Sequence, residues 1–352
     1  MSYARSYWHE ARAHTGRCPA DEAFGVTGTF SAGVQRWAVR LAGMLPYAQA
    51  EAVLVDLAGV GMSDTAIWQC VQRVGQQAED YLAAQAARHT ALPDPDQISA
   101  GLAPPAPPLG VSLDGAKFLV RGEGWKEAKV GCVFGFAPSG EWRQRNDNEP
   151  AEAVRASAIT YVFQLGPPEP FGARLWAEAE RRGWSAARQT VALGDGAAWI
   201  WSLADFHFPG ATPIVDWFHA KQHLWDAAQL IYGLDSPRAA AFVNRHAKNL
   251  YWGRVDNIAR AIKRPAQPAT RAARDREAAY FTENRARMQY RRFQAAKLPI
   301  GSGTVESGCK QFKARFAQAG MRWSRPGAIH LMPWRAAIMS QRFDQLWQAI
   351  FH

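Results

Sequence analysis

The segment that decides the fold begins with Val111-Ser-Leu-Asp-Gly-Ala-Lys-Phe-Leu-Val120. A second apolar run extends from Trp125 to Phe136, and runs of this length and composition predict two strands. The turn signal Ser139-Gly140 precedes Glu141 to Asn146, where a third strand is expected. The core of the protein therefore opens with a meander of strands.

Helical and extended patterns alternate after this meander. Helices are predicted over Phe171–Trp184, Ala197–Phe206 and Trp217–Tyr232, with short apolar strands at Thr190–Gly194 and Thr212–Val215 between them. A meander that feeds such alternating units gives a mixed sheet with helices on both faces. The predicted fold class is α/β, and this order of elements is that of the ribonuclease-H-like fold.

Helical segments flank and interrupt this core. Residues 34–90 have helical patterns, and the proline-rich stretch from Pro93 to Pro108 predicts a linker. Gly301 is expected to open a helix that runs to about Ala319, and a final apolar helix follows Pro326. The expected parts are a helical N-terminal domain with its linker (1–105), the first part of the core (106–235), a basic helical insertion broken by Pro265 and Pro268 (236–297) and the second part of the core (298–352).

A helix-turn-helix outline lies within the N-terminal helices. Two helical patterns flank Gly59-Val-Gly-Met-Ser63, and Ser63 is the expected N-cap of the second helix. Such a unit can place its second helix in the major groove of DNA. A plain helical hairpin has the same pattern, so both interpretations stay open.

The positive charge of the chain is concentrated in one region. The net charge is +10. Residues 242–325 hold 19 Lys or Arg against 5 Asp or Glu, an excess of 14, whereas residues 1–242 hold 20 against 25. A local excess of this size favours a nucleic-acid partner over a merely solvated helical face.

Cysteine usage and hydropathy narrow the class of protein further. The four cysteines (Cys18, Cys70, Cys132 and Cys309) lie far apart and form no C-x-x-C pair, which argues against a zinc site and against a disulfide framework. Apolar stretches stay well below the roughly 20 residues that cross a bilayer, and Met1 to Glu10 lacks the apolar region of a signal peptide. We expect a cytoplasmic protein without a membrane partner.

Three acids in apolar surroundings are the candidate catalytic residues. Phosphodiester chemistry on DNA commonly uses two divalent metals, and Mg²⁺ or Mn²⁺ needs carboxylates that converge on one point. Asp114 lies in the first predicted strand, Asp195 directly follows a later strand, and Glu306 lies in the first turn of a late helix. Each has an ordinary alternative: Asp114-Gly115 is also a hairpin-turn signal, Asp195 could only cap a helix, and Glu306 could only favour the helix dipole.

Other polar and aromatic residues accompany these acids. Asp216 and His219 form a D-x-x-H pair that suits metal binding, although an aspartate that caps a helix and holds a histidine is the commoner arrangement. The tryptophans Trp199, Trp201 and Trp323 could stack on unpaired bases, and a place in the core is their commoner role. The predicted phosphate-binding cations are Lys310, Lys313, Arg315 and Arg322.

Five longer motifs follow one another along the chain: Val111-Ser-Leu-Asp-Gly115, Gly124-Trp-Lys-Glu-Ala-Lys-Val-Gly131, Leu193-Gly-Asp-Gly-Ala-Ala-Trp-Ile-Trp201, Val215-Asp-Trp-Phe-His219 and Gly301-Ser-Gly-Thr-Val-Glu-Ser-Gly-Cys-Lys310. Together they resemble the motifs of bacterial insertion-sequence transposases of the ISKra-four family, which is related to the ISL-type enzymes. The segments Gly320-Met-Arg-Trp-Ser324 and Ser340-Gln-Arg-Phe-Asp344 are also similar to that family. The resemblance spans roughly Asp21 to Trp347.

The resemblance implies a DDE transposase with a helical insertion between its second and third acids. It implies that Asp114, Asp195 and Glu306 hold two Mg²⁺ (or Mn²⁺) ions and that Asp216 and His219 are accessory, with Asp216 as the competing second acid. The implied partners are the DNA of element ends and target, with a homo-oligomer assembled on that DNA. Relatives usually carry paired cysteines in an upstream segment, so we expect an N-terminally shortened copy. The alternative function is a catalytically inactive, DNA-binding relic of a transposase.

Overall fold

The structure is a computed structural model. It describes residues 8–10, 15–23, 26–27, 30–90, 107–143, 152–265 and 268–351. The chain divides into two compact units. One comprises residues 1–81, 120–122 and 315–352, and the other comprises residues 82–119 and 123–314. The predicted linker prolines from Pro93 to Pro105 lie outside the described residues.

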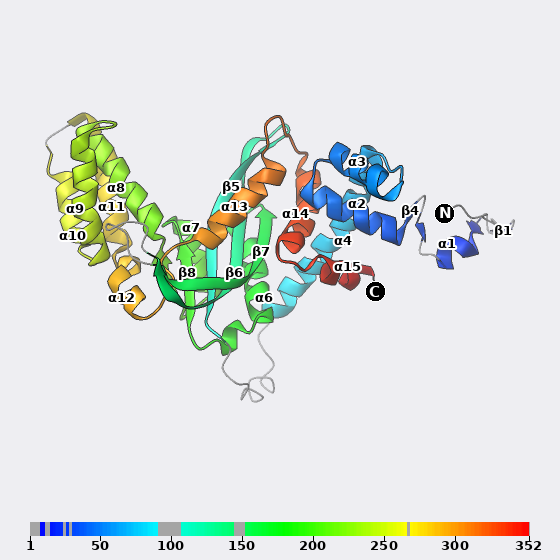
Figure 1. The fold of residues 1–352 in the computed structure, drawn as a ribbon, viewed down its shortest axis with the longest axis horizontal. Coiled ribbons are helices and arrows are strands. Elements are labelled where there is room, and N and C mark those ends of the chain that lie inside the picture. The colour runs from blue at the N-terminus through cyan, green and yellow to red at the C-terminus, as the bar shows by residue number, and fades with distance from the viewer. Residues whose placement is uncertain are drawn as a thin grey trace. The chain divides into compact units, whose positions relative to one another are not determined.

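The larger unit is built on a five-stranded mixed sheet with the strand order β7-β6-β5-β8-β9 (Figure 1). Strands β6 and β7 are antiparallel, whereas β5 pairs parallel with β8, and β8 pairs parallel with β9. The predicted mixed α/β sheet is therefore confirmed. The strands are β5 (Leu109–Val120), β6 (Gly124–Arg143), β7 (Glu152–Leu165), β8 (Thr190–Gly194) and β9 (Thr212–Val215).

The central strands are covered on both faces. In β8, four consecutive residues from Val191 to Gly194 are buried, which is the pattern of a parallel strand between two layers of helices. Helix α6 (Pro168–Arg181) packs closely on β6, because a Cβ at Gly131 would lie 2.8 Å from the Phe171 ring. Helices α7 (Ala198–His207) and α8 (Trp217–Tyr232) follow β8 and β9. These three helices lie close to the ranges that the sequence predicts.

Helix α13 (Gly303–Phe316) crosses the sheet in Figure 1. Its side chain Phe312 packs edge-on against Phe118 of β5 and Phe163 of β7, at centroid distances of 5.7 and 5.2 Å. A Cβ at Gly308 would lie 2.6 Å from the Tyr161 ring, so the helix approaches β7 closely. The aromatic contacts therefore fix the height of α13 over the strands.

The bounds of β5 and β6 decide two predictions, a possible turn at Asp114-Gly115 and a third strand over Glu141–Asn146. Asp114-Gly115 lies inside β5 and is no hairpin turn, since the strand continues to Val120. The third strand predicted over Glu141–Asn146 is wrong, because Glu141 to Arg143 continue β6. The strand that follows is β7, which the sequence analysis missed.

The residues from 236 to 297, called the basic segment below, form helices that gather beside the far end of α8 in Figure 1. Pro265 and Pro268 fall between its second and third helices, as predicted. The second helix buries Val255, Ile258 and Ile262 on one face and exposes its charged residues. The helices are α9 (Pro237–Tyr251), α10 (Val255–Lys263), α11 (Arg271–Glu283) and α12 (Tyr290–Ala295).

The smaller unit is mainly helical. Its helix α14 (Arg325–Met339) begins with Pro326 in the first turn and packs on α2 (Ala32–Met44). The final helix predicted after Pro326 is two helices, because Gln341 adopts a positive φ of 57° before α15 (Phe343–Phe351). The short N-terminal elements are β1 (Trp8–Glu10), β2 (Thr15–Arg17), α1 (Pro19–Ala23), β3 (Val26–Thr27) and β4 (Phe30–Ser31).

The helix-turn-helix outline corresponds to α3 (Tyr47–Ala58) and α4 (Asp64–Thr90). Gly59 ends α3 with a φ of 61°, and the Ser63 hydroxyl accepts a hydrogen bond from the Ala66 amide at 3.3 Å, as expected of an N-cap. The first turn of α4 carries Asp64, a charge that disfavours phosphate. DNA reading by this unit stays a prediction.

No helix in the described part of the chain combines the length and the apolar character that a membrane crossing requires.

Candidate active site

Three aspartates lie near one edge of the parallel part of the sheet: Asp114 lies within β5, just past the stretch that pairs with β8, whereas Asp195 and Asp216 directly follow β8 and β9. Ser112 of β5 pairs with Leu193 of β8, so Asp114 and Asp195 each stand two residues beyond a register pair. Asp216 directly follows β9, and its backbone N–H donates to Gly194 O at 2.8 Å. This edge of a sheet is where open α/β folds place their sites.

Asp114 is half-buried, and the thiol of Cys309 on α13 donates to its Oδ2 at 3.2 Å. The Gly115 amide donates to its Oδ1 at 2.6 Å. Burial raises the pKa of the Asp114 carboxyl, and the nearby carboxylate of Asp195 raises it further, although the two donors act in the opposite direction. The charged carboxylate of Asp114 is therefore incompletely compensated by the protein.

Asp195 occupies the turn between β8 and α7. Its Oδ1 accepts from the Ala197 amide at 2.8 Å, and its backbone oxygen accepts from the Tyr280 hydroxyl at 2.8 Å. The N-cap of α7 is Ala197 rather than Asp195. The helix-capping alternative for Asp195 is thus wrong, and Oδ2 of this carboxyl takes no part in either contact.

Asp216 has a structural task that Asp195 lacks. It is the N-cap of α8, accepts from the His219 amide at 2.7 Å, and also accepts from the Ser302 amide. Burial alone would raise the pKa of Asp216, but the hydrogen bonds from His219 and Ser302 outweigh it and lower that pKa. The hydrogen bond to Asp216, with Nδ1 to Oδ1 at 3.3 Å, raises the pKa of His219. The D-x-x-H pair is therefore an ion pair at a helix start.

Glu306 lies in the first turn of α13, as the sequence predicts. Its side chain is 55% exposed, and Oε1 pairs with Lys310 Nζ at 3.0 Å. One turn later on the same helix, Cys309 contacts Asp114. Among the residues that the structure describes, no three His, Cys, Asp or Glu side chains form a group that could hold a metal ion. The structure thus brings Asp114 and Asp195 together and leaves the Glu306 carboxylate turned to Lys310.

The predicted phosphate-binding cations fall into two kinds. Lys310, Lys313 and Arg322 are exposed. Arg315 is only 1% exposed and donates from Nε to Ala42 O at 2.7 Å, so its assignment as a DNA contact is wrong. A guanidinium enclosed by the core cannot reach a phosphate.

The three candidate stacking residues also differ. Trp201 and Trp323 are buried, at 5% and 7% exposure, which supports their place in the core. Trp199 is half-buried, and Lys129 Nζ lies 4.0 Å from its ring centroid. A cation over the ring face is a contact that stabilises the side chain where it stands.

Asp114 and Asp195 offer oxygen ligands of the kind that a hard divalent cation takes. Two carboxylates on neighbouring strands, one of them with a raised pKa, repel each other in a partly dehydrated setting. A Mg²⁺ or Mn²⁺ ion prefers such oxygen ligands and removes the repulsion. In the described conformation Glu306 pairs with Lys310 and takes no part in a group of three carboxylates among the described residues.

The residues that surround Asp195 were missed by the sequence analysis. Tyr280 binds the Asp195 backbone, and His223 stacks on Tyr280 at a centroid distance of 3.6 Å. The Glu277 carboxylate pairs with His223 Nδ1 across 2.7 Å. A tyrosine within a run of charged helix residues gives no sequence signal for such a contact.

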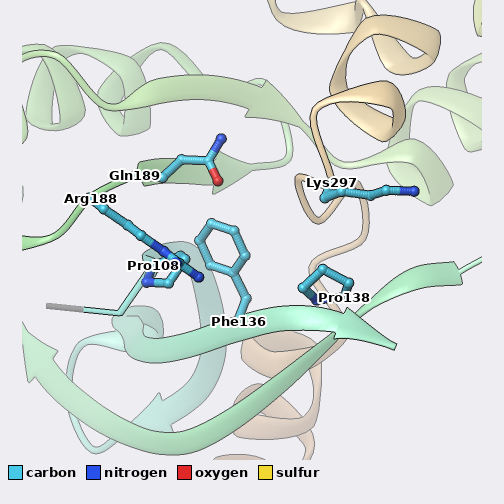
Figure 2. Close-up of a pocket in the computed structure, with 6 residues that line it drawn as sticks. All are labelled: Pro108, Phe136, Pro138, Arg188, Gln189 and Lys297. Carbon is cyan, nitrogen blue, oxygen red and sulfur yellow. The ribbon is translucent and has the colours of Figure 1, made fainter. Parts of the chain in front are cut away.

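A cavity of about 250 Å³ lies at the opposite ends of the strands (Figure 2). Pro108 and Gln189 directly precede β5 and β8, and Phe136 points its ring into the space between Gln189 and Lys297. Arg188 and Lys297 give the lining a positive charge, and Pro138 completes it. The cavity lies at the amino ends of β5 and β8, and none of Asp114, Asp195 and Asp216 lines it.

The fold and the site together define a mixed α/β protein with converging carboxylates at the ends of parallel strands. No protein-family model matches the chain. No curated protein matches it either.

Proposed function

We propose that this protein is a DNA transposase that cleaves and joins phosphodiesters with divalent metal ions, on a ribonuclease-H-like core. The observation that carries the proposal is the pairing of Asp114 and Asp195 beyond register-matched positions of two parallel strands. The strand order supports the fold assignment: β5, β6 and β7 are successive neighbours, and β8 and β9 add on the other side of β5. The family resemblance of the motifs supports the activity.

Asp114 and Asp195 are the first two metal ligands in this proposal. The Ala197 amide orients the Asp195 carboxyl, and the Cys309 thiol and the Gly115 amide orient Asp114. Glu306 would be the third ligand, and its carboxylate would then have to leave Lys310. Two bound Mg²⁺ (or Mn²⁺) ions would supply activation of water, and then of a freed 3′-hydroxyl, for in-line attack.

Asp195 is the preferred second acid over Asp216. Both carboxylate oxygens of Asp216 accept hydrogen bonds from backbone amides, and the carboxylate also forms an ion pair with His219. These contacts occupy lone pairs that a metal ion would need. Asp195 uses one oxygen for a single amide. Asp216 and His219 accordingly act as accessory residues that hold the start of α8 against Ser302.

Arg322, in the smaller unit, is a candidate DNA contact by itself. The exposed cations of the basic segment, together with Lys310 and Lys313, form the proposed DNA surface of the larger unit. Among them are Arg245, Lys248, Arg260 and Lys263, all exposed. Because the surface follows backbone phosphates, it suits element ends and target DNA alike. We further propose a cytoplasmic protein that assembles as a homo-oligomer on this DNA.

The test uses the purified chain and linear DNA that carries the sequences flanking its gene. We expect strand cleavage and joined products with Mg²⁺ or Mn²⁺ and none with a chelator. Asp195→Asn is expected to lose both products, while Asp216→Asn, assayed below its unfolding temperature, keeps a measurable part. Full activity in Asp195→Asn would overturn the assignment of the second acid.

A second candidate is a DNA-binding relic without catalysis, which the exposed, Lys310-paired state of Glu306 favours. It predicts tight binding of the same DNA with no metal-dependent cut. Cutting without joined products would instead indicate a nuclease on this fold. The one cleavage assay separates all three.

Salt dependence tests the DNA surface directly. Each neutralised phosphate releases counterions, so with about 6–10 phosphate contacts the affinity should fall roughly 10³- to 10⁵-fold between 50 and 200 mM salt. Replacement of Lys248 by Ala should lower the slope of log affinity against log salt by about 1. Asp256→Asn, at an exposed carboxylate that pairs with Arg285, should leave the slope unchanged or make it steeper. Fluorescence anisotropy with labelled duplex measures both. A flat profile would contradict the proposed surface.

A further inference from the structure

A tyrosine of the basic segment is bonded to the backbone that carries Asp195. Tyr280 on α11 donates its hydroxyl to Asp195 O at 2.8 Å, a contact between residues 85 positions apart in sequence. A phenol has an ordinary pKa of about 10, so this hydroxyl is a hydrogen-bond donor throughout the physiological pH range.

The turn around Asp195 is shaped to receive this ring. Gly196 has a φ of 106°, a conformation that residues with a Cβ rarely adopt. A Cβ at Gly196 would lie 2.5 Å from Tyr280 Cε2, well inside van der Waals contact. The ring and the hydroxyl of Tyr280 thus hold two successive residues of the turn.

Tyr280 is itself held in place by two further side chains. The His223 ring on α8 stacks on it with centroids 3.6 Å apart and an interplanar angle of 24°. Nδ1 of His223 lies 2.7 Å from Oε2 of Glu277, which stands one turn before Tyr280 on the same face of α11. The ring is therefore fixed from α8 and from its own helix.

A second tyrosine repeats the contact at the next strand. Tyr290 of α12 is fully buried and donates to Val215 O at 3.0 Å, immediately before Asp216. The ring centroid of Trp217 lies 4.9 Å from that of Tyr290. The basic segment therefore reaches the chain at the ends of both β8 and β9.

We propose that Tyr280 is a positioning residue for Asp195, through which the basic segment fixes the turn that aims this carboxylate. The expected effect of Tyr280 on catalysis rests on the proposed function. The expected effect of Tyr280 on the turn rests on the contacts described above. Tyr280 does not touch the reacting atoms. Its action is to remove the freedom of the turn between β8 and α7 before DNA and metal bind.

The test compares Tyr280→Phe, which keeps the ring and loses the hydroxyl, with Tyr232→Phe, a change at an exposed tyrosine of α8. Hydrogen exchange of a peptide spanning residues 193–199 should be about 5-fold faster in Tyr280→Phe, the ratio that loss of one hydrogen bond of ordinary strength gives. Calorimetric titration should show weaker Mn²⁺ binding. On flanking-sequence DNA the turnover should fall about 10-fold while the affinity for DNA is unchanged. Tyr232→Phe should match the unchanged protein in every readout.

The outcomes separate this inference from the proposed function. If the unchanged protein cleaves and Tyr280→Phe equals Tyr232→Phe in exchange, Mn²⁺ binding or turnover, the positioning role is overturned and the function stands. If the unchanged protein does not cleave, the proposed function fails. Hydrogen exchange and Mn²⁺ affinity then still test the positioning role of Tyr280. Reduced DNA affinity in Tyr280→Phe would also overturn it, since that would mark a DNA contact.

Discussion

Asp114→Asn is expected to reduce metal-dependent cleavage by a factor on the order of 10³ or more while leaving the protein folded. A metal ligand lost from a two-metal site removes several kcal/mol of transition-state stabilisation, and each 1.36 kcal/mol corresponds to about tenfold in rate. The amide of asparagine keeps the shape of the side chain. The loss therefore measures the charge and not the packing.

The same change should not lower the stability of the metal-free protein. Because the folded pKa of Asp114 lies above its ordinary value, the folded chain holds this carboxylate at a cost at neutral pH. That cost is present above the unfolded pKa and disappears as the pH falls and the group protonates. Removal of the charge removes the cost, so the melting temperature of Asp114→Asn should equal or exceed that of the unchanged protein.

Asp216→Asn is the matched control with the opposite sign. The folded pKa of Asp216 is lowered, so its contribution to stability is present above the unfolded pKa and is lost as the pH falls through the folded pKa. Loss of charge-assisted bonds from the amides of His219 and Ser302 should cost about 1.5–3 kcal/mol. Thermal unfolding in chelator, beside the cleavage assay, checks both variants. A lower melting temperature for Asp114→Asn than for Asp216→Asn would contradict the division of roles.

How far the sequence predicts the fold depends on the surroundings of each strand. The bounds of β8, β9 and α8 are predicted to the residue, because short buried parallel strands are largely apolar runs. Gly194 ends β8, and Asp216 separates β9 from α8. The edge strand β7 was missed. Charged and small residues, such as Arg155 and Ala156, interrupt its apolar residues and weaken the sequence signal of a strand. Its pairing with β6 is a long-range contact, which local sequence patterns do not reveal.

The candidate site shows the same division. The positions of Asp195 and Asp216 follow from strand ends, which are visible as changes in hydropathy. Asp114 is visible as an acid within an otherwise apolar strand. The Glu306 carboxylate forms an ion pair with Lys310, one turn away. The i,i+4 spacing of the two residues allows this ion pair but does not tell whether Glu306 forms it or binds a metal ion. Tyr280 was missed because its contact with Asp195 spans 85 residues and joins the basic segment to the sheet.

Arg315 illustrates the opposite error, in which a local pattern gives the wrong environment. It follows two exposed lysines on a basic helix, yet its guanidinium lies 4.9 Å from the Trp323 ring centroid and 5.4 Å from that of Tyr47. Burial, with the positive charge of Arg335 nearby, lowers the pKa of Arg315 to about 10. The side chain is thus a buried cation held by aromatic faces and by the Ala42 carbonyl.

Arg315→Ala is therefore expected to destabilise the protein by about 3–5 kcal/mol, through a cavity in the core and an unpaired Ala42 carbonyl. Arg315→Met keeps most of the volume and removes a charge that is costly to bury, so its loss should stay below about 2 kcal/mol. Arg322→Ala, at an exposed position, should change stability by no more than about 0.5 kcal/mol and should weaken DNA binding instead. Urea unfolding with DNA anisotropy on the same samples measures both quantities. A stable Arg315→Ala with weakened DNA binding would return this residue to the DNA surface, because only an exposed guanidinium gives that pair of results.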